Sequence, residues 1–418
     1  MSRSVTNSMR SDSAPRIAIL CDSLAGWAGG IDLLCFLVNS LTSVSPGTSW
    51  SLLLPSNSVA RSLAALAKRG LKTLVGLKTY PRMSNVEVID AITNSGSQVD
   101  VIGYRDAASG LASAMRQCRA EALFPCTRSL GRSFPLPWIG YITDLQHKRL
   151  PHWFTKMERW HRDRVFSRML AEAPAVVVNA AAVVQDIEEF YPNHRARLFA
   201  LPFCPPADLK RFSDALDPEV RAGYHLPAKY FMVSNQFWIH KSHETAFMAL
   251  RLVRDAGHDV HLVCTGNTSD YRRPEHFNNL KAIIEKNNLR EYVHILGLIP
   301  KGDQLAIMRG SLAVIQPTLF EGGPGGGSVY DAVSTRTPSI VSDIPVNREI
   351  DIGVVRFFAA GSAEDLAAKM AEMLVNPPQK LGEEETFAQL KRRQRELGSL
   401  LLDITKFVAN PRSAPPGT

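Results

Sequence analysis

Residues 313–349 of the chain read AVIQPTLFEGGPGGGSVYDAVSTRTPSIVSDIPVNRE. The first seven residues form an apolar run that is typical of a buried parallel strand. The run leads into EGGPGGGS, a turn with five glycines in eight residues, and a predicted helix and another strand follow. A glycine-rich turn between a strand and a helix brings backbone N–H groups close to a bound anion, and the helix N-terminus adds about half a positive charge.

Two acidic residues flank this turn, Glu321 before it and Asp331 after it. A mobile surface loop can also be rich in glycine, so the glycines alone do not decide the function. The acids, however, are predicted near the carboxyl end of a strand, where open α/β sheets bind ligands. We interpret the stretch as a nucleotide-sugar site in which Glu321 holds sugar hydroxyls and Asp331 accepts hydrogen bonds from a ribose. The candidate donor-binding residues within the turn are Gly325, Gly326, Gly327 and Ser328.

The stretch resembles the C-terminal signature of GT-B glycosyltransferases of the family-4 type, also called glycosyl transferases group 1. That signature has two acidic residues with seven residues between them, whereas nine residues separate Glu321 from Asp331 here, and the second acid is Asp. The resemblance implies an α/β fold of two Rossmann-like domains that face a cleft. It also implies transfer of a sugar from a nucleotide-sugar to an acceptor hydroxyl, with retention of configuration and without a bound metal.

Composition fits a soluble two-domain protein. The 418 residues are 45% hydrophobic and 21% charged, and no uncharged apolar run approaches the roughly 18 residues of a transmembrane helix. The first fifteen residues lack the apolar segment of a secretory signal, so we predict a disordered leader. The six cysteines are scattered without a CxxC pair, which argues against a zinc site or a disulfide framework and for a cytoplasmic setting.

The positive charge lies in the first half of the chain. Residues 1–210 hold 24 Lys and Arg against 16 Asp and Glu, a net charge of +8, whereas residues 211–418 hold 24 of each sign. A basic half can face an anionic membrane, nucleic acid or an anionic acceptor, or can serve solubility alone. Within residues 148–168, cations alternate with Trp153, Trp160 and Phe166. This pattern fits a helix on anionic lipid, at the cytoplasmic face of the inner membrane, but also aromatic residues packed in the core. We expect no nucleic acid as a partner.

Strand and helix patterns alternate along the chain, which predicts parallel, doubly wound sheets. In the first half we predict strands at residues 16–21, 49–54, 100–104, 121–125, 138–142 and 175–179. In the second half we predict strands at residues 230–234, 259–266, 293–297, 313–319 and 354–358. Gly29 and Gly30 follow the first strand in a turn that is not GxGxxG, and the resemblance places them beside the donor phosphates.

Asp144 and His147 follow the strand at residues 138–142. A carboxylate and an imidazole there can meet an acceptor hydroxyl or the donor sugar, although a single histidine is more often structural. Many family members carry a histidine directly before an aspartate at the corresponding place, whereas here Thr143 precedes Asp144. Either His147 or the Thr143–Asp144 pair can therefore face the sugar, and we take His147, Asp144 and Glu321 as the candidate catalytic residues.

Lys241 begins a predicted helix after the strand at residues 230–234, and its charge and the helix N-terminus suit a pyrophosphate. The family shows Arg and Lys separated by four residues at this place. Gln236 occupies the position of the Arg, so His240 or a more distant Arg has to supply the second cation. The resemblance also places the nucleotide base against Leu298 and Ile299.

A linker with Pro202, Pro205 and Pro206 divides the chain. We predict a leader at residues 1–15, an acceptor domain at 16–205, a donor domain at 206–385, a helix at 386–409 that packs back on the first domain, and a disordered tail at 410–418.

The resemblance thus implies a retaining, metal-independent hexosyltransferase without a cofactor. Its expected partners are a nucleotide-sugar donor and a glycan or glycolipid acceptor of cell-surface polysaccharide or lipopolysaccharide biosynthesis. Two alternatives share the fold, and fold alone does not decide between them and the transferase. One is a nucleotide-sugar epimerase or phosphorylase-like enzyme, and the other is a non-catalytic nucleotide-sugar-binding protein.

Overall fold

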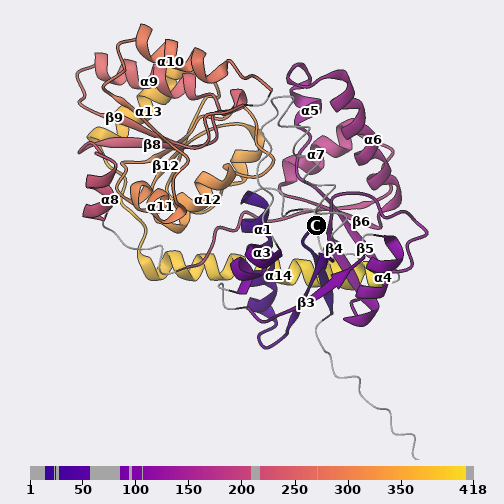
Figure 1. Ribbon diagram of the computed structural model, residues 1–418. Coiled ribbons are helices and arrows are strands. Elements are labelled where there is room, and N and C mark those ends of the chain that lie inside the picture. Colours follow the sequence, from indigo (N-terminus) through magenta and orange to yellow (C-terminus); the bar gives the residue numbers. More distant parts are fainter. Residues whose placement is uncertain are drawn as a thin grey trace, which may run out of the picture.

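The computed structural model describes residues 15–22, 24, 28–56, 85–93, 97–105, 107–208, 217–270 and 272–410. The predicted leader and tail therefore lie almost entirely outside the described residues. Within these residues the strands form two parallel sheets, one in each half of the chain (Figure 1). The α/β fold of two Rossmann-like domains is confirmed.

The N-terminal sheet has the strand order β3-β2-β1-β4-β5-β6-β7. Its strands are β1 (Ile17–Leu20), β2 (Trp50–Pro55), β3 (Val99–Tyr104), β4 (Ala122–Cys126), β5 (Trp138–Ile142), β6 (Ala175–Val178) and β7 (Arg197–Ala200). The helices between them are α1 (Ala28–Val44), α3 (Asn85–Thr93), α4 (Ala108–Gln117), α5 (Gln146–Arg149), η1 (Pro151–Trp153), α6 (Lys156–Glu172) and α7 (Ala181–Phe190). The sequence analysis missed β7, a four-residue strand at the edge of the sheet, because its exposed Arg197 interrupts the apolar pattern.

The C-terminal sheet has the strand order β10-β9-β8-β11-β12-β13. Its strands are β8 (Tyr230–Ser234), β9 (His261–Thr265), β10 (Val293–Gly297), β11 (Val314–Gln316), β12 (Ser339–Ser342) and β13 (Val355–Phe358). The helices are α8 (Pro218–Gly223), η3 (Ile239–Lys241), α9 (His243–Asp255), α10 (His276–Lys286), α11 (Lys301–Arg309), α12 (Gly326–Ser334), η4 (Pro345–Glu349) and α13 (Ala363–Val375). β11 and β12 are buried along their whole length, as central parallel strands are when helices cover both faces.

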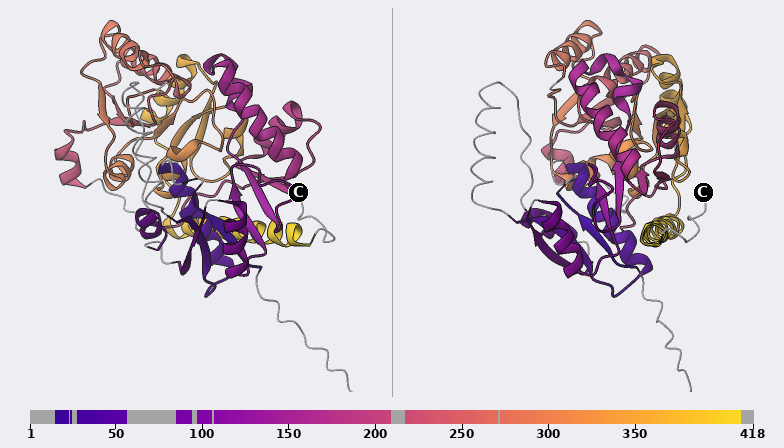
Figure 2. Two further views of the ribbon diagram at one scale, coloured as in Figure 1. Left: turned by 45° about the vertical axis from the view of Figure 1, so that its right-hand side comes forward. Right: turned by 90° about the vertical axis from the view of Figure 1, so that its right-hand side faces the viewer.

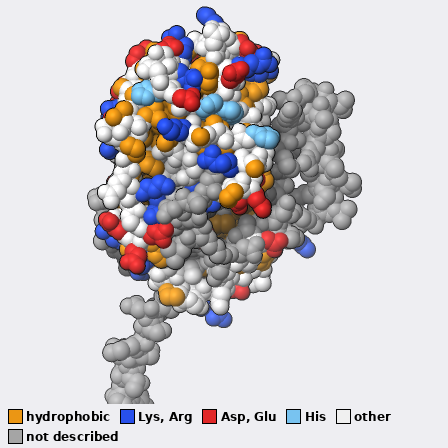
Figure 3. Space-filling view, turned by 90° about the vertical axis from the view of Figure 1, so that its left-hand side faces the viewer, with side chains coloured by type: hydrophobic (Ala, Val, Ile, Leu, Met, Phe, Trp, Pro, Cys, Tyr) orange, Lys and Arg blue, Asp and Glu red, His pale blue; other side chains and the backbone are white. Residues whose placement is uncertain are grey.

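The surface of the C-terminal half reflects its balanced charge. On the face shown in Figure 3, Lys and Arg side chains are interspersed with Asp and Glu side chains. Among the described residues, no helix has both the length and the apolar character that crossing a bilayer requires.

The last helix, α14 (Glu383–Ala409), joins the two halves. In Figure 1 and in the left view of Figure 2 it runs beneath the C-terminal half and then crosses the N-terminal half. Its 27 residues span about 40 Å at 1.5 Å per residue. Leu390 packs with Val329 and Val333 of the C-terminal half, whereas Leu397 and Leu401 belong to the core around β1 and α1. The expected return of this helix to the first domain is confirmed.

Close contact between α14 and α1 depends on Gly398. A Cβ atom at this position would lie 2.1 Å from the carbonyl oxygen of Ser40, a distance that real Cβ atoms do not show. We therefore expect Gly398→Ala to force the two helices apart and to lower the free energy of unfolding by about 1–3 kcal/mol.

The matched control is Gly302→Ala in α11, where the added Cβ meets open space. Alanine favours a helix over glycine by up to about 1 kcal/mol, so this variant should be neutral or more stable. Urea denaturation followed by circular dichroism measures both. Equal stabilities of the two variants would show that the contact between α1 and α14 tolerates a wider spacing.

Candidate functional site

The order of the C-terminal sheet changes direction between β8 and β11. The chain adds β9 and β10 on one side of β8 and then returns to add β11, β12 and β13 on the other. Such a parallel sheet binds ligands at the carboxyl ends of the strands where the direction changes. η3 follows β8 at this edge, and the glycine-rich turn follows β11. The fold therefore brings Lys241 and Glu321 together.

Lys241 and Glu321 form a nearly buried ion pair. The Lys241 ammonium contacts Glu321 Oε1, and the two side chains are only 11% and 9% exposed. Gln316 Nε2 donates a hydrogen bond to the same oxygen at 2.9 Å. Two charges taken out of water need this kind of mutual support, because each alone would carry a desolvation cost of several kcal/mol. The edge thus presents one cation and one anion side by side.

Two glycines of the turn have backbone conformations that favour glycine. The φ angles of Gly325 and Gly326 are +65° and +56°, in the left-handed region. A Cβ on Gly325 would lie 2.4 Å from Val329, and one on Gly326 would lie 3.0 Å from Gln316 Nε2. These positions therefore exclude larger residues.

The first turn of α12 faces the same edge of the sheet. Gly327 is exposed and has open space where a Cβ would lie. The buried hydroxyl of Ser328 has no hydrogen-bond partner among the described residues. A helix leaves its first N–H groups without partners of its own, so this turn can bind an anion.

Asp331 pairs with a lysine that the sequence analysis did not single out. The ammonium of Lys301 contacts Asp331 Oδ2; the aspartate side chain is 8% exposed and that of the lysine 47%. Lys301 begins α11, and Gln304 in the next turn donates to Ser234 Oγ at the end of β8 at 2.5 Å. A second pair of opposite charges therefore lies at this edge.

Neither His240 nor Gln236 supplies a cation. Burial lowers the pKa of His240 from 6.5 to about 2, and the charges of Lys241 and Arg272 add to the effect, so the imidazole is neutral. Gln236 Oε1 instead accepts the backbone N–H of Asn267 at 3.0 Å. Besides Lys241, the described cations near this edge include Lys301, which pairs with Asp331, and Arg272, whose charge acts on His240.

Leu298 and Ile299 follow β10 and differ in burial. Leu298 is 78% exposed, whereas Ile299 packs against the cluster that contains Tyr230 and Met232. The exposed leucine offers an apolar surface beside the edge at which Lys241 and Glu321 lie.

In the N-terminal sheet the order changes direction between β1 and β4. Gly29 and Gly30 lie in the first turn of α1, which follows β1. They therefore lie at the corresponding edge of the first domain, while residues 25–27 before them fall outside the described residues.

The glycine-rich turn touches the ends of β5 and β6. A Cβ on Gly322 would lie 2.5 Å from the carbonyl oxygen of Thr143 and 2.9 Å from Asp144 Cβ, and one on Gly323 would lie 3.2 Å from Asn179 Cβ. The Asp144 carboxylate accepts a hydrogen bond from Arg162 at 2.6 Å, within an ion pair. Thr143 and Asp144 thus adjoin the Glu321 turn across the two halves.

His147 is buried, and its ring contacts side chains of the N-terminal half. Its side chain is 0% exposed, and its Nε2 lies 3.0 Å from Asp163 Oδ1, which also accepts from the Tyr191 hydroxyl at 2.6 Å. Burial, with the nearby charge of Arg162, lowers the pKa of His147, so the neutral form is favoured. In this structure the imidazole orders α5 against α6, and the Thr143–Asp144 pair is the one beside the turn.

Glu349 makes a second contact between the halves. Its two carboxylate oxygens accept the backbone N–H groups of Ala181 and Ala182 at 2.9 and 2.7 Å. These residues begin α7, whose own N-cap residue, Ala180, has no side chain that could do so. A carboxylate of the C-terminal half therefore caps a helix of the N-terminal half, where negative charge is stabilised by the helix dipole.

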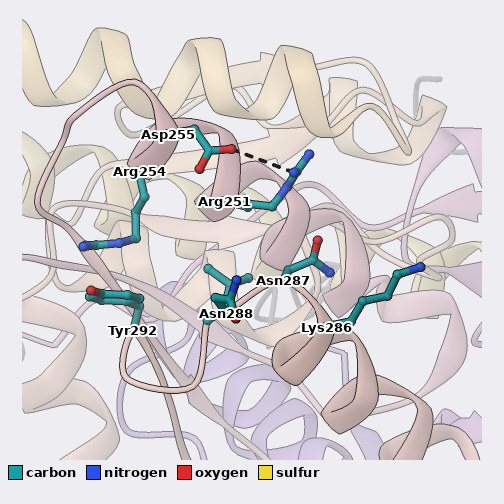
Figure 4. A pocket seen from close by; sticks show the side chains of 8 residues that line it. Arg251, Arg254, Asp255, Lys286, Asn287, Asn288 and Tyr292 are labelled. Atoms are coloured by element: carbon teal, nitrogen blue, oxygen red, sulfur yellow. Dashed lines mark ion pairs between the residues drawn. The ribbon is translucent and has the colours of Figure 1, made fainter.

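A separate cavity of about 340 Å³ lies between the ends of α9 and α10 (Figure 4). Its arginines are engaged locally: Arg254 stacks on Tyr292 and bonds Asp259, and Arg251 pairs with Asp255. Neither the Lys241–Glu321 pair nor the Lys301–Asp331 pair lines this cavity, so we do not assign it to the site.

Several buried polar residues of the site were missed from the sequence. They are Gln316 and Asn347, both 0% exposed, and Asn235 at 9%. A glutamine that ends an apolar strand is a signal that could have found Gln316. Lys301 carried no such signal, because a lysine at the start of a helix is common and its partner Asp331 lies thirty residues further along the chain. Among the described residues, no group of three or more His, Cys, Asp or Glu side chains could hold a metal ion.

Comparisons with known proteins agree with the resemblance noted from the sequence. The family model described as glycosyl transferases group 1 matches residues 223–394. A search of curated proteins finds no match. Structural neighbours of the chain include GT-B glycosyltransferases. The sequences of three of them are only 12–13% identical to this chain, so the likeness is evidence for the fold alone.

Three of these structures are similar over nearly the whole chain. A glycosyltransferase from Rickettsia africae has a TM-score of 0.62 at 13% identity, covering 96% of this chain and 100% of its own. HepE from Anabaena, in complex with UDP-glucose, has a TM-score of 0.54 at 12% identity, with coverages of 94% and 98%. The lipopolysaccharide outer core galactosyltransferase WaaB has a TM-score of 0.58 at 12% identity, with coverages of 94% and 99%.

Proposed function

We propose that this protein is a retaining glycosyltransferase that transfers a sugar from a nucleotide-sugar to an acceptor hydroxyl. The observation that carries the proposal is the ion pair between Lys241 and Glu321 at the switch point of the C-terminal sheet. A bound diphosphate would take the Lys241 ammonium and the N–H groups of the α12 N-terminus. Glu321 would then accept hydrogen bonds from the sugar hydroxyls, while Asp331 would accept them from the ribose.

The reaction exchanges one bond at the anomeric carbon. The bond from this carbon to the diphosphate oxygen breaks, and a bond from the acceptor oxygen to the same carbon forms on the same face. The proton of the acceptor hydroxyl passes to the leaving phosphate oxygen, so that no protein base is needed. Positive charge develops on the sugar ring as in glycoside hydrolysis, and Lys241 with backbone donors stabilises the departing diphosphate without a metal.

The acceptor is proposed to be a glycan or glycolipid of the bacterial cell surface. Two observations support this: HepE is described with UDP-glucose and WaaB as a lipopolysaccharide galactosyltransferase, and the N-terminal half carries the net positive charge. Uridine diphosphate sugars are therefore the first donors to test.

We also propose that α6 rests on anionic lipid at the cytoplasmic face of the inner membrane. If Trp153, Trp160 and Phe166 all packed in the core, Trp160 would be buried. Instead, Trp160 is 57% exposed, and Met157 on the same helix is 71% exposed. Arg164 lies 5.6 Å from the Trp160 ring centre. Exposed apolar side chains flanked by cations suit the boundary between lipid headgroups and acyl chains.

Thermal denaturation with UDP, GDP, ADP, CMP and dTDP and with their sugar conjugates tests the donor class. A ligand at about 100 times its Kd should stabilise the fold by about 2.7 kcal/mol and raise the Tm visibly. We expect uridine nucleotides to stand out. A protein that no nucleotide stabilises would not be a nucleotide-sugar transferase, and binding without any turnover would favour the non-catalytic alternative.

Two variants separate the roles of the ion pair. Glu321→Ala should abolish sugar transfer and leave the affinity for the nucleotide diphosphate close to that of the wild type, because the acid addresses the sugar. Lys241→Ala should lower the affinity for the nucleotide diphosphate by about ten- to a hundredfold, since a charged hydrogen bond is lost. Isothermal titration calorimetry and donor turnover measure both, and a fully active Glu321→Ala would refute the assignment.

Vesicle co-sedimentation tests the membrane contact. Replacement of both Met157 and Trp160 by Ser should reduce binding to vesicles with about 30% phosphatidylglycerol, and salt should weaken the wild type, because the attraction is partly electrostatic. Val375→Ser is the control, as Val375 is 66% exposed in the other half. An equal loss in the control, or no binding by the wild type, would contradict the proposal.

A further inference from the structure

Two buried amide side chains contact the glycine-rich turn before α12, and a third supports one of them. Gln316 and Asn347 are fully buried and Asn235 is nearly so. Asn235 Nδ2 donates to Gln316 Oε1, which leaves both Gln316 N–H groups for the glycine-rich turn. Buried polar groups are costly unless paired, so these amides fix what they bind.

Gln316 holds the turn at two points. Its Nε2 donates to Glu321 Oε1 at 2.9 Å and to the carbonyl oxygen of Gly325 at 2.8 Å. Asn347 binds the other backbone group of the same glycine, because its Oδ1 accepts a hydrogen bond from the Gly325 N–H at 2.8 Å. One amide therefore ties the acidic residue at the start of the turn to the left-handed glycine before the helix.

The turn needs such a tie for two reasons. It contains five glycines, which lose much conformational freedom when they are ordered, and it is two residues longer than the spacing of the signature it resembles. In addition, Glu321 Oε1 contacts the ammonium of Lys241. A diphosphate that takes this ammonium would leave Glu321 with less support at the moment when the sugar arrives.

We propose that Gln316 is a positioning residue that keeps the Glu321 carboxylate in place when Lys241 turns to a donor diphosphate. The inference rests on the proposed function, since it assigns Glu321 to the sugar and Lys241 to the diphosphate. Gln316 acts through Glu321 and through the Gly325 carbonyl. Replacement of Gln316 should therefore weaken binding of the sugar part of the donor and leave binding of the nucleotide part unchanged.

The first experiment compares the affinities of UDP and UDP-glucose by calorimetry, together with slow hydrolysis of UDP-glucose. If the nucleotide panel selects another base, its diphosphate and its glucose conjugate replace these probes. In Gln316→Leu we expect the gain in affinity from the glucose, and the kcat of hydrolysis, to fall by about ten- to a hundredfold. The Kd of UDP should stay within about threefold of the wild type, because the diphosphate contacts remain.

The control for stability is Val314→Ala. Val314 lies on the same strand and is fully buried among apolar side chains, so this variant loses stability without touching the turn. Hydrogen exchange of residues 321–327 in the ligand-free protein should accelerate in Gln316→Leu and not in Val314→Ala. Equal effects of the two variants on exchange and on the glucose-dependent affinity would overturn the proposal.

Gln316→Glu supplies a rescue that a purely structural role does not predict. The new carboxylate repels Glu321 at high pH, but a shared proton restores one hydrogen bond as the pH falls. Relative to the wild type at the same pH, hydrolysis by this variant should recover between about pH 8 and pH 6. A flat ratio would count against positioning. A wild type that binds no nucleotide would refute the proposed function itself, whereas normal binding with an unaffected Gln316→Leu would refute only this inference.

Discussion

The buried pair of Lys241 and Glu321 is the constraint around which the C-terminal half is arranged. Charges that are about nine-tenths shielded from water persist only if neighbouring groups support them. The fold provides this support by ending β8 and β11 side by side and by placing the Gln316 amide beneath the carboxylate. The same turn contains the left-handed Gly325 and Gly326, and α12 begins directly after Gly325. Asn347 bonds Gly325, and Asn235 bonds Gln316, so that both buried asparagines help to hold the turn beside Lys241.

Contact between the halves is concentrated near the same place. The turn that carries Glu321 lies against Thr143, and the strand that follows leads to Glu349, which caps α7 of the first domain. The turn that carries Glu321 is therefore in direct contact with the end of β5 in the N-terminal half. A movement of one domain relative to the other would therefore change the positions of Glu321 and Asp144 relative to each other.

The sequence predicted the parts of this structure that depend on local pattern. Apolar runs and glycine turns gave the strands, and their alternation gave the two sheets. Lys241 and Glu321 were found because both follow strands, but their pairing depends on a strand order that no local pattern encodes. Lys301 was missed because it is an ordinary helix-starting lysine until α11 is docked beside α12. His147 follows β5, and the contacts of its ring with Asp163 and Tyr191 come from tertiary packing, which no local pattern encodes.

The path of α14 has a consequence for synthesis of the protein. Leu397, Leu401 and Ile404 complete the hydrophobic core around β1, which is translated long before α14. Domains commonly fold one after another as a chain emerges at about 5–20 residues per second. Here the first sheet stays without part of its covering until α14 has left the ribosome, so its exposed apolar face is a natural target for chaperones during translation.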